Sequence, residues 1–210
     1  MPGQGSVYDA ENLAFILPAG KYIGNSRYKD VFAASTSADL TSYRNQWGAE
    51  TGLDVALYRP VARYELIAKD VKAFLNKLAT GGLKGESFTA RVKYSDYLPT
   101  GYNLMDDVPK NSLMYMEYKV DFERPADGTE ELKLGFDDVT VSAGEPASIT
   151  VELEILNEKN EVLARTVLRI PCERGKNTTV RGNFLTSDVN GGIGIDPGYD
   201  GDLEVDLGEL

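Results

Sequence analysis

Apolar and polar residues alternate with a period of two along most of the chain beyond about residue 88. In residues 149–155, isoleucine, valine and leucine occupy the odd positions, while threonine and glutamate occupy the even ones. The same alternation covers residues 114–122 and 132–136. Such alternation is typical of strands that bury one face and expose the other, as in antiparallel sheets. We therefore expect antiparallel β-structure over this part of the chain.

Turn-forming sequences lie between these predicted strands. They are Pro99-Thr100-Gly101, Pro125-Ala126-Asp127-Gly128, Ala143-Gly144-Glu145-Pro146 and Asn157-Glu158-Lys159-Asn160. The last of them would join residues 148–156 to residues 161–170 in a hairpin. Strands at this spacing favour an all-β sandwich with Greek-key connections.

One segment has helical rather than strand periodicity. Its apolar residues recur at positions i, i+3, i+4 and i+7: Val71, Phe74, Leu75 and Leu78. Asp70 stands where the N-cap would be, and Gly81-Gly82 follow where a helix would stop. The pattern predicts a short amphipathic helix that covers a sheet. Residues 61–67, just before it, predict a strand.

Residues 1–58 follow neither pattern clearly. Residues 13–17 predict a strand, whereas residues 22–50 are rich in serine, threonine, asparagine and tyrosine and have weak periodicity. A segment of this length is short for a core of its own. We expect it to be either the C-terminal part of an N-terminal β-sandwich domain or an extension packed on the main domain. The main domain would then comprise residues 59–210.

Composition narrows the chemistry that such a fold could perform. The 210 residues include no histidine, one cysteine, 22 basic and 33 acidic side chains, for a net charge of -11. The absence of histidine excludes histidine-dependent triads and imidazole-ligated zinc. Cys172 alone can form neither an intrachain disulfide nor a cysteine-rich metal cluster. The negative charge makes nucleic acid an unfavourable partner. We expect no catalytic residues, no cofactor and no bound metal.

Clustered carboxylates are the remaining candidates for chemistry. The pairs Asp106-Asp107 and Asp137-Asp138 and the group Asp196, Asp200 and Asp202 could form a carboxylate dyad or a calcium site. The last group lacks the closing bidentate glutamate of a calcium loop. Aspartate also favours turns, where its side chain bonds to nearby backbone groups. The preferred interpretation is therefore solvated aspartates in turns.

Twelve tyrosines and one tryptophan could instead form a platform for carbohydrate. Tyr97 and Tyr102 flank the Pro-Thr-Gly sequence, and Trp47 lies in the irregular N-terminal part. Tyrosine is also a favoured strand residue, so most of the twelve are expected to pack inside the fold. Tyr97, Tyr102 and Trp47 are the candidate ligand aromatics of a glycan-binding surface module, which is the alternative function.

Four stretches of the chain, in order, resemble one known family. They are Leu57-Tyr58-Arg59-Pro60-Val61-Ala62-Arg63, Val92-Lys93-Tyr94 with Leu98-Pro99-Thr100-Gly101-Tyr102-Asn103, residues 174–186, and Ile195-Asp196-Pro197-Gly198-Tyr199-Asp200-Gly201. The third contains a basic-Asn-x-Thr strand that ends in Gly-Asn-Phe-Leu-Thr. Together they make residues 57–205 similar to the fimbrillin-like proteins of Bacteroidales, a family of type V pilus subunits and proteins assigned to cell adhesion.

This resemblance implies a Greek-key transthyretin-like β-sandwich for residues 59–210, with part of an N-terminal β domain before it. Tyr28-Lys29-Asp30-Val31-Phe32 looks similar to one of the final strands of that first domain. The family's function implies an adhesion or fimbrial subunit at the cell surface, outer membrane or fimbrium, acting by assembly and contact. Its partners would be other fimbrial subunits or surface proteins, joined by strand addition, and a host or glycan ligand.

The chain itself carries no sequence signal for export. No basic segment leads into an apolar stretch at its start, and residues 13–18 are too few to span a bilayer. A cytoplasmic protein would have such a sequence, and so would an exported protein without its signal. The resemblance implies the second alternative, with a lipoprotein signal and most of a first domain removed or truncated.

The C-terminal residues offer a strand for addition to a partner. Leu203, Val205 and Leu207 alternate with acidic residues, which predicts a strand with one apolar face. Such a strand can pair with an exposed sheet edge on a neighbour. The same pattern suits an edge strand within this chain, protected by its acidic face. Both alternatives remain open.

Overall fold

Strands dominate the protein. A computed structural model describes residues 8–9, 14–16, 22–144, 147–187 and 204–206. The strands are β1 (Tyr8–Asp9), β2 (Ala14–Ile16), β3 (Val61–Ala68), β4 (Ser87–Tyr94), β5 (Leu98–Asn103), β6 (Val108–Leu113), β7 (Glu117–Glu123), β8 (Leu132–Thr140), β9 (Ala147–Asn157), β10 (Val162–Cys172), β11 (Asn177–Gly182) and β12 (Glu204–Asp206). The helices are α1 (Val71–Ala79) and the short 3₁₀ helices η1 (Arg27–Lys29) and η2 (Thr41–Tyr43). The expectation of an all-β fold with one short α-helix is confirmed.

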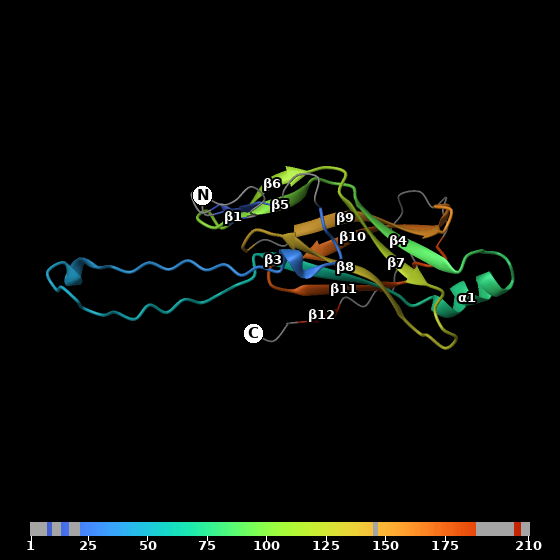
Figure 1. Cartoon of the computed structure of the whole chain (residues 1–210), viewed down its shortest axis with the longest axis horizontal. Coiled ribbons are helices and arrows are strands. Elements are labelled where there is room, and N and C mark those ends of the chain that lie inside the picture. The colour runs from blue at the N-terminus through green and yellow to red at the C-terminus, as the bar shows by residue number, and fades with distance from the viewer. Residues whose placement is uncertain (1–7, 10–13, 17–21, 145–146, 188–203, 207–210) are drawn as a thin grey trace.

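The strands form three four-stranded sheets (Figure 1). Their orders are β1-β2-β5-β6, β10-β9-β4-β7 and β12-β11-β3-β8. The predicted hairpin is present as β9 and β10, which pair along most of their length. Of the described strand pairs, β11 and β3 are parallel and the others are antiparallel. The antiparallel expectation is wrong at this pair, because β11 reaches β3 through a long crossover rather than a hairpin.

The core lies between the second and third of these sheets. It includes Leu66 of β3, Val92 of β4, Leu153 of β9 and Phe74 of α1, each at most 1% exposed. Because one cluster draws side chains from both sheets, the sheets pack face to face as a sandwich. Strands from both sides of residue 58 share a sheet, since β2 pairs with β5. The division at residue 58 and the transthyretin-like topology stay predictions.

Helix α1 lies where the periodicity predicted it and packs against β4. The rings of Phe74 and Phe88 meet edge to face with centroids 5.0 Å apart. Asp70 precedes the helix, but its side chain does not cap it. The carboxylate instead accepts hydrogen bonds from the backbone N–H groups of Leu185 (3.0 Å) and Thr186 (2.8 Å). Asp70 therefore links the segment that follows β11 to the start of the helix by hydrogen bonds.

No helix among the described residues is long and apolar enough to cross a membrane. Cys172 is 1% exposed, and burial raises the pKa of its thiol to about 12. The thiol is therefore protonated at neutral pH and a poor nucleophile.

Three predicted boundaries are wrong. Pro99-Thr100-Gly101 lies inside β5 rather than in a turn. Pro99 lies opposite Ser112 of β6, and the described pairing of β5 with β2 covers Gly101 to Asn103. The strand predicted from residue 114 begins at Glu117, because Tyr115 has a φ of 60° and interrupts the extended backbone. Residues 28–32 form no strand, since η1 occupies their start.

Asp137 and Asp138 are not solvated turn residues. They lie in β8 and are 0% and 2% exposed. The register between β8 and β3 shifts beside Gly135, which has a φ of 154°. A Cβ at Gly135 would lie 3.1 Å from the Tyr118 ring, so any other residue would crowd that ring in addition to straining the backbone at this φ. Beyond this bulge consecutive residues are buried instead of alternate ones, and both aspartates need partners inside the protein.

Candidate interaction surfaces

Residues 34–57, which we call the arm, project away from the sandwich as an outgoing and a returning leg (Figure 1). Two backbone hydrogen bonds between Ala33 and Tyr58, of 2.8 and 2.9 Å, close the base of the arm. Every residue from 35 to 57 is exposed. The arm and α1 lie at opposite ends of the molecule (Figure 1). The arm therefore presents its side chains outward and adds little to the core.

Several apolar side chains of the arm face solvent. Trp47 is 97% exposed, and Leu53, Val55 and Leu57 are 54, 48 and 62% exposed. The last three alternate with an aspartate and an alanine, so residues 53–57 have one apolar face when extended. This segment pairs with none of the described strands. Sequence reasoning selected Trp47 but missed the other three, although their period-two spacing was a usable signal.

Residues 22–33 anchor the arm to β8. Lys29 is 5% exposed, and its ammonium group lies 2.5 Å from the carboxylate of Asp137. Lys29 also donates a hydrogen bond to the Tyr22 hydroxyl at 2.8 Å. The Tyr22 hydroxyl donates to Asp137, and the Tyr94 hydroxyl donates to the same carboxylate at 2.5 Å. We call these four residues the clasp.

The two charged residues of the clasp, Lys29 and Asp137, form an ion pair, and this pairing offsets the free-energy cost of burying them. The Asp137 carboxylate accepts the backbone N–H of Asp138 at 2.9 Å in addition to its bonds from Lys29 and the two tyrosines. Burial lowers the pKa of Lys29, and the Asp137 carboxylate partly offsets this effect. Burial and the same carboxylate raise the pKa of Tyr22 and of Tyr94. Both tyrosines therefore stay protonated and act as donors.

Ion pairs at the base of the arm extend this anchor toward the surface. Arg63 contacts the Asp138 carboxylate through two hydrogen bonds of 2.9 Å and lies 3.6 Å from Asp30. Arg59 donates to Asp30 at 2.8 Å, and its guanidinium group lies over the Phe32 ring at 4.5 Å. Buried and half-buried charges thus hold both legs of the arm where they leave the sandwich.

A second anchor lies at Tyr58, where the returning leg ends. The hydroxyls of Tyr58 and Tyr102 donate to Asp107 at 2.6 and 2.5 Å. Arg174 donates to the other oxygen of Asp107 at 2.8 Å and lies 4.0 Å from the Tyr58 ring centroid. Burial by itself raises the pKa of Asp107, but hydrogen bonds from Arg174 and the tyrosines outweigh it and lower the pKa to about 2. The carboxylate is therefore ionised at neutral pH.

The predicted site residues do not come together. Tyr97 is 66% exposed and follows β4, whereas Trp47 is on the arm. Tyr102 is 0% exposed and bonded to Asp107 and Arg174, so it has no open ring face for a ligand. Val205 lies opposite Thr178 in the pairing of β12 with β11. Leu203 and Leu207, like Asp196, Asp200 and Asp202, lie outside the described residues, and a partner-strand role for the C-terminus stays a prediction.

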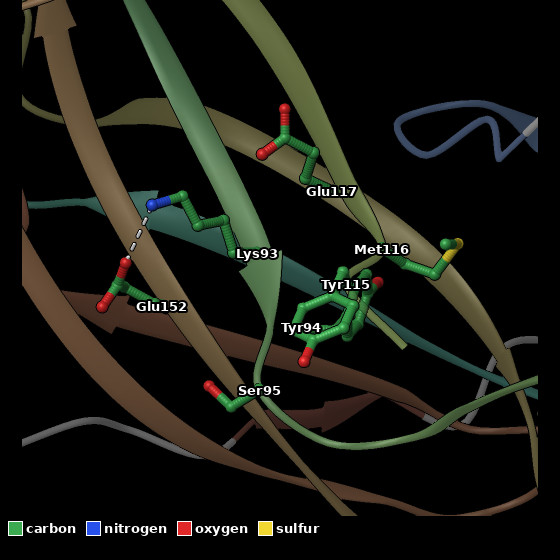
Figure 2. A pocket seen from close by; sticks show the side chains of 7 residues that line it. All are labelled: Lys93, Tyr94, Ser95, Tyr115, Met116, Glu117 and Glu152. Atoms are coloured by element: carbon green, nitrogen blue, oxygen red, sulfur yellow. Dashed lines mark hydrogen bonds and ion pairs between the residues drawn. The ribbon is translucent and has the colours of Figure 1, made fainter. Parts of the chain in front are cut away.

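A hollow of about 310 Å³ opens beside the end of β4 (Figure 2). It is lined by Lys93, Tyr94, Ser95, Tyr115, Met116, Glu117 and Glu152. These residues come from the end of β4, the approach to β7 and the middle of β9. Sequence reasoning selected none of them as site residues, because no motif links three such distant stretches.

Glu154 organises the charged face of the sheet next to this hollow. Its carboxylate is 0% exposed and lies 2.5 Å from Arg91, 2.8 Å from Lys93 and 2.7 Å from Arg165. Burial alone raises the pKa of Glu154, but hydrogen bonds from Lys93, Arg165 and Arg91 outweigh it and lower the pKa to about 2. Lys93 also lies 3.1 Å from Glu152, which fixes it at the edge of the hollow (Figure 2).

The fold and these surfaces define an all-β sandwich protein with a projecting arm. The sequence matches DUF6562, described as a family of unknown function, over residues 2–208, and the chain therefore belongs to that family. No curated protein matches the sequence.

Among solved structures, the chain is similar to the crystal structure of a proposed cell adhesion protein from Bacteroides ovatus ATCC 8483. The two share 15% sequence identity with a TM-score of 0.34. The similarity covers 61% of this chain and 40% of the Bacteroides protein, so the chain spans well under half the length of that protein. Membership of the fimbrillin-like family stays a prediction.

Proposed function

We propose that this chain is a structural subunit of a bacterial cell surface, of the adhesion or fimbrial kind, which acts by assembly and contact rather than by catalysis. The observation that carries the proposal is the arm, which holds Trp47 97% exposed and leaves residues 53–57 without a strand partner among the described residues. The resemblance of residues 57–205 to fimbrillin-like proteins supports the same function.

The length and chemistry of the arm support a contact role. Connections longer than about 12–15 residues without regular structure are uncommon in compact domains and are usually functional or act as linkers. Residues 34–57 exceed that length and contain only η2. Complete burial of a large apolar side chain gains about 1.5–3 kcal/mol. A partner that covered Trp47 and the apolar face of the returning leg would gain this energy, whereas the isolated chain does not.

We infer that the partner of the returning leg is a sheet edge of a second copy of this chain. Residues 53–57 lie in the drawn-out returning leg (Figure 1), and their alternation would give one apolar face that could pack while the backbone pairs as a strand. β6 ends its sheet and keeps all of its side chains at least partly exposed, so it offers such an edge. Pairing of the arm of one copy with β6 of another forms a closed dimer where the exchange is reciprocal, and a ring or an open filament where the contact runs head to tail.

Sedimentation velocity over a range of protein concentrations tests this function. In the variant Leu53→Asp/Val55→Asp, two charges occupy the apolar face of the returning leg. Burial of unpaired carboxylates is costly, so we expect self-association to weaken by more than roughly tenfold. The matched control is Asp54→Asn, which changes the opposite face of the same segment and should associate like the unchanged chain.

The two variants should fold alike, because all three positions are exposed. The proposal fails if the unchanged chain is monomeric at every concentration. It also fails if the aspartate double variant associates as strongly as Asp54→Asn.

A further inference from the structure

The hollow beside the end of β4 is large enough for a small molecule. Its volume of about 310 Å³ lies at the lower end of the range of roughly 300–1,000 Å³ for ligand pockets. Tyr94 lines it with only 5% of its surface exposed, and its hydroxyl is held by Asp137 of the clasp. The surface beneath a ligand would therefore be rigid, because that tyrosine is fixed from inside the protein.

Tyr115 is the most unusual residue of the hollow. It is 85% exposed, and its φ of 60° lies in the left-handed region, which a residue with a bulky side chain rarely adopts. No hydrogen bond to its hydroxyl occurs within the described part of the chain. Strained backbone of this kind is often found where function, rather than packing, places a side chain. Here it places an aromatic side chain among the residues that line the hollow (Figure 2).

The polar groups that line the hollow can both donate and accept hydrogen bonds. Lys93 contributes an ammonium group, Ser95 a hydroxyl, and Glu117 and Glu152 contribute carboxylates (Figure 2). Sugar hydroxyls act as donors and acceptors at once, so this mixture suits them. The carbon-bound hydrogens of a pyranose would lie against the Tyr115 ring, which combines an apolar face with a polar tip.

Charge selects among the ligands that such a site could take. The two carboxylates outnumber the single ammonium group of the lining, which opposes acidic sugars. Glu152 is already paired with Lys93 at 3.1 Å and lies 3.8 Å from Arg165. Glu117 is therefore the one carboxylate of the lining whose charge no lining ammonium group compensates, and a single carboxylate offers a basic peptide little charge to bind.

We propose that the hollow is a binding site for a neutral mono- or disaccharide, stacked on Tyr115 and held by hydrogen bonds to Lys93, Ser95, Glu117 and Glu152. This inference goes beyond the assembly function and does not depend on it. The site would let a surface subunit bind glycan at one place while the arm makes protein contacts at another.

A microarray of immobilised oligosaccharides tests the ligand class. It should carry neutral gluco-, galacto- and manno-configured glycans together with sialylated and sulfated ones, and a tetralysine peptide serves as the basic comparator. We expect binding to neutral glycans only. The proposal is overturned if no neutral glycan binds, if only acidic glycans bind, or if the tetralysine peptide competes for the site.

Isothermal titration calorimetry with the neutral glycan that binds best then tests the site. Tyr115→Ala removes the stacking ring and should weaken binding roughly tenfold, in line with the energy of aromatic stacking. Tyr115→Phe keeps the ring and should bind within a few-fold of the unchanged chain. Trp47→Ala removes an exposed aromatic from the arm and should leave glycan binding unchanged, even if it weakens assembly. Equal affinity of Tyr115→Ala and the unchanged chain would overturn the assignment.

Discussion

Replacement of Lys29 by methionine tests whether the clasp holds the base of the arm. Methionine keeps much of the apolar stem and the volume of the lysine, but it removes the charge that faces Asp137. The carboxylate would then be buried at 0% exposure, and no other cation of the described residues is paired with it. Such an uncompensated charge is the dominant cost of the substitution.

The size of the effect follows from what remains around Asp137. Loss of one partner from a buried ion pair costs about 3–5 kcal/mol. The carboxylate keeps the hydroxyls of Tyr22 and Tyr94 and the N–H of Asp138, so we expect the lower end of that range. A loss of about 3 kcal/mol corresponds to a fall in Tm of about 6–12 °C for a chain of this size. The double variant Lys29→Met/Asp137→Asn has no unpaired charge and should recover most of the loss.

Urea unfolding of the four members of this double-mutant cycle, followed by circular dichroism, measures the coupling between the two residues. Hydrogen exchange of residues 22–33 provides a second readout, because a weakened clasp should expose their amides faster while the sandwich core stays protected. The reasoning is refuted if Lys29→Met costs less than about 1 kcal/mol. It is also refuted if the double variant is no more stable than Lys29→Met alone.

Two further predictions concern the sandwich itself. Glu154 has a pKa lowered from 4.5 to about 2, which corresponds to about 3 kcal/mol of stability that is present above pH 4.5 and lost as the pH falls through 2. Glu154→Gln should therefore lower the free energy of unfolding by about that amount at pH 7. The variant's stability should also depend less on pH between 4.5 and 2. Equal acid sensitivity of the variant and the unchanged chain would contradict the lowered pKa of Glu154. Asp70→Ala should cost about 2–3 kcal/mol in urea unfolding, because the N–H groups of Leu185 and Thr186 lose their acceptor; a neutral effect would mean that water replaces the carboxylate.

Periodicity was sufficient to predict much of the sandwich. The alternation along β9 and the i, i+3, i+4, i+7 pattern of α1 depend on local sequence, and both elements lie where they were expected. The burial of Asp137 was not predictable in this way. It depends on a bulge at Gly135 and on Lys29, which is supplied from a distant part of the chain. The general preference of aspartate for turns is therefore misleading for Asp137, whose burial depends on a partner that is distant in the sequence.

The candidate surfaces likewise differ in whether the sequence alone could predict them. Trp47 was selected from its residue type, and the period-two spacing of Leu53, Val55 and Leu57 could have been read from the sequence. The hollow could not, because Lys93, Tyr115 and Glu152 meet only through tertiary packing. The backbone strain at Tyr115 likewise has no signal in the sequence, since tyrosine rarely adopts a positive φ.

In the proposed function, the returning leg of the arm pairs with a sheet edge of a second copy of the chain. Hydrogen exchange of residues 51–57, measured by mass spectrometry at low and at high protein concentration, tests it most directly. In the isolated chain these residues are exposed and belong to no described strand, so their amides should exchange rapidly. Strand addition would give them hydrogen-bond partners, and we predict that their exchange slows as concentration rises, together with that of β6. Equally fast exchange at all concentrations would contradict the account.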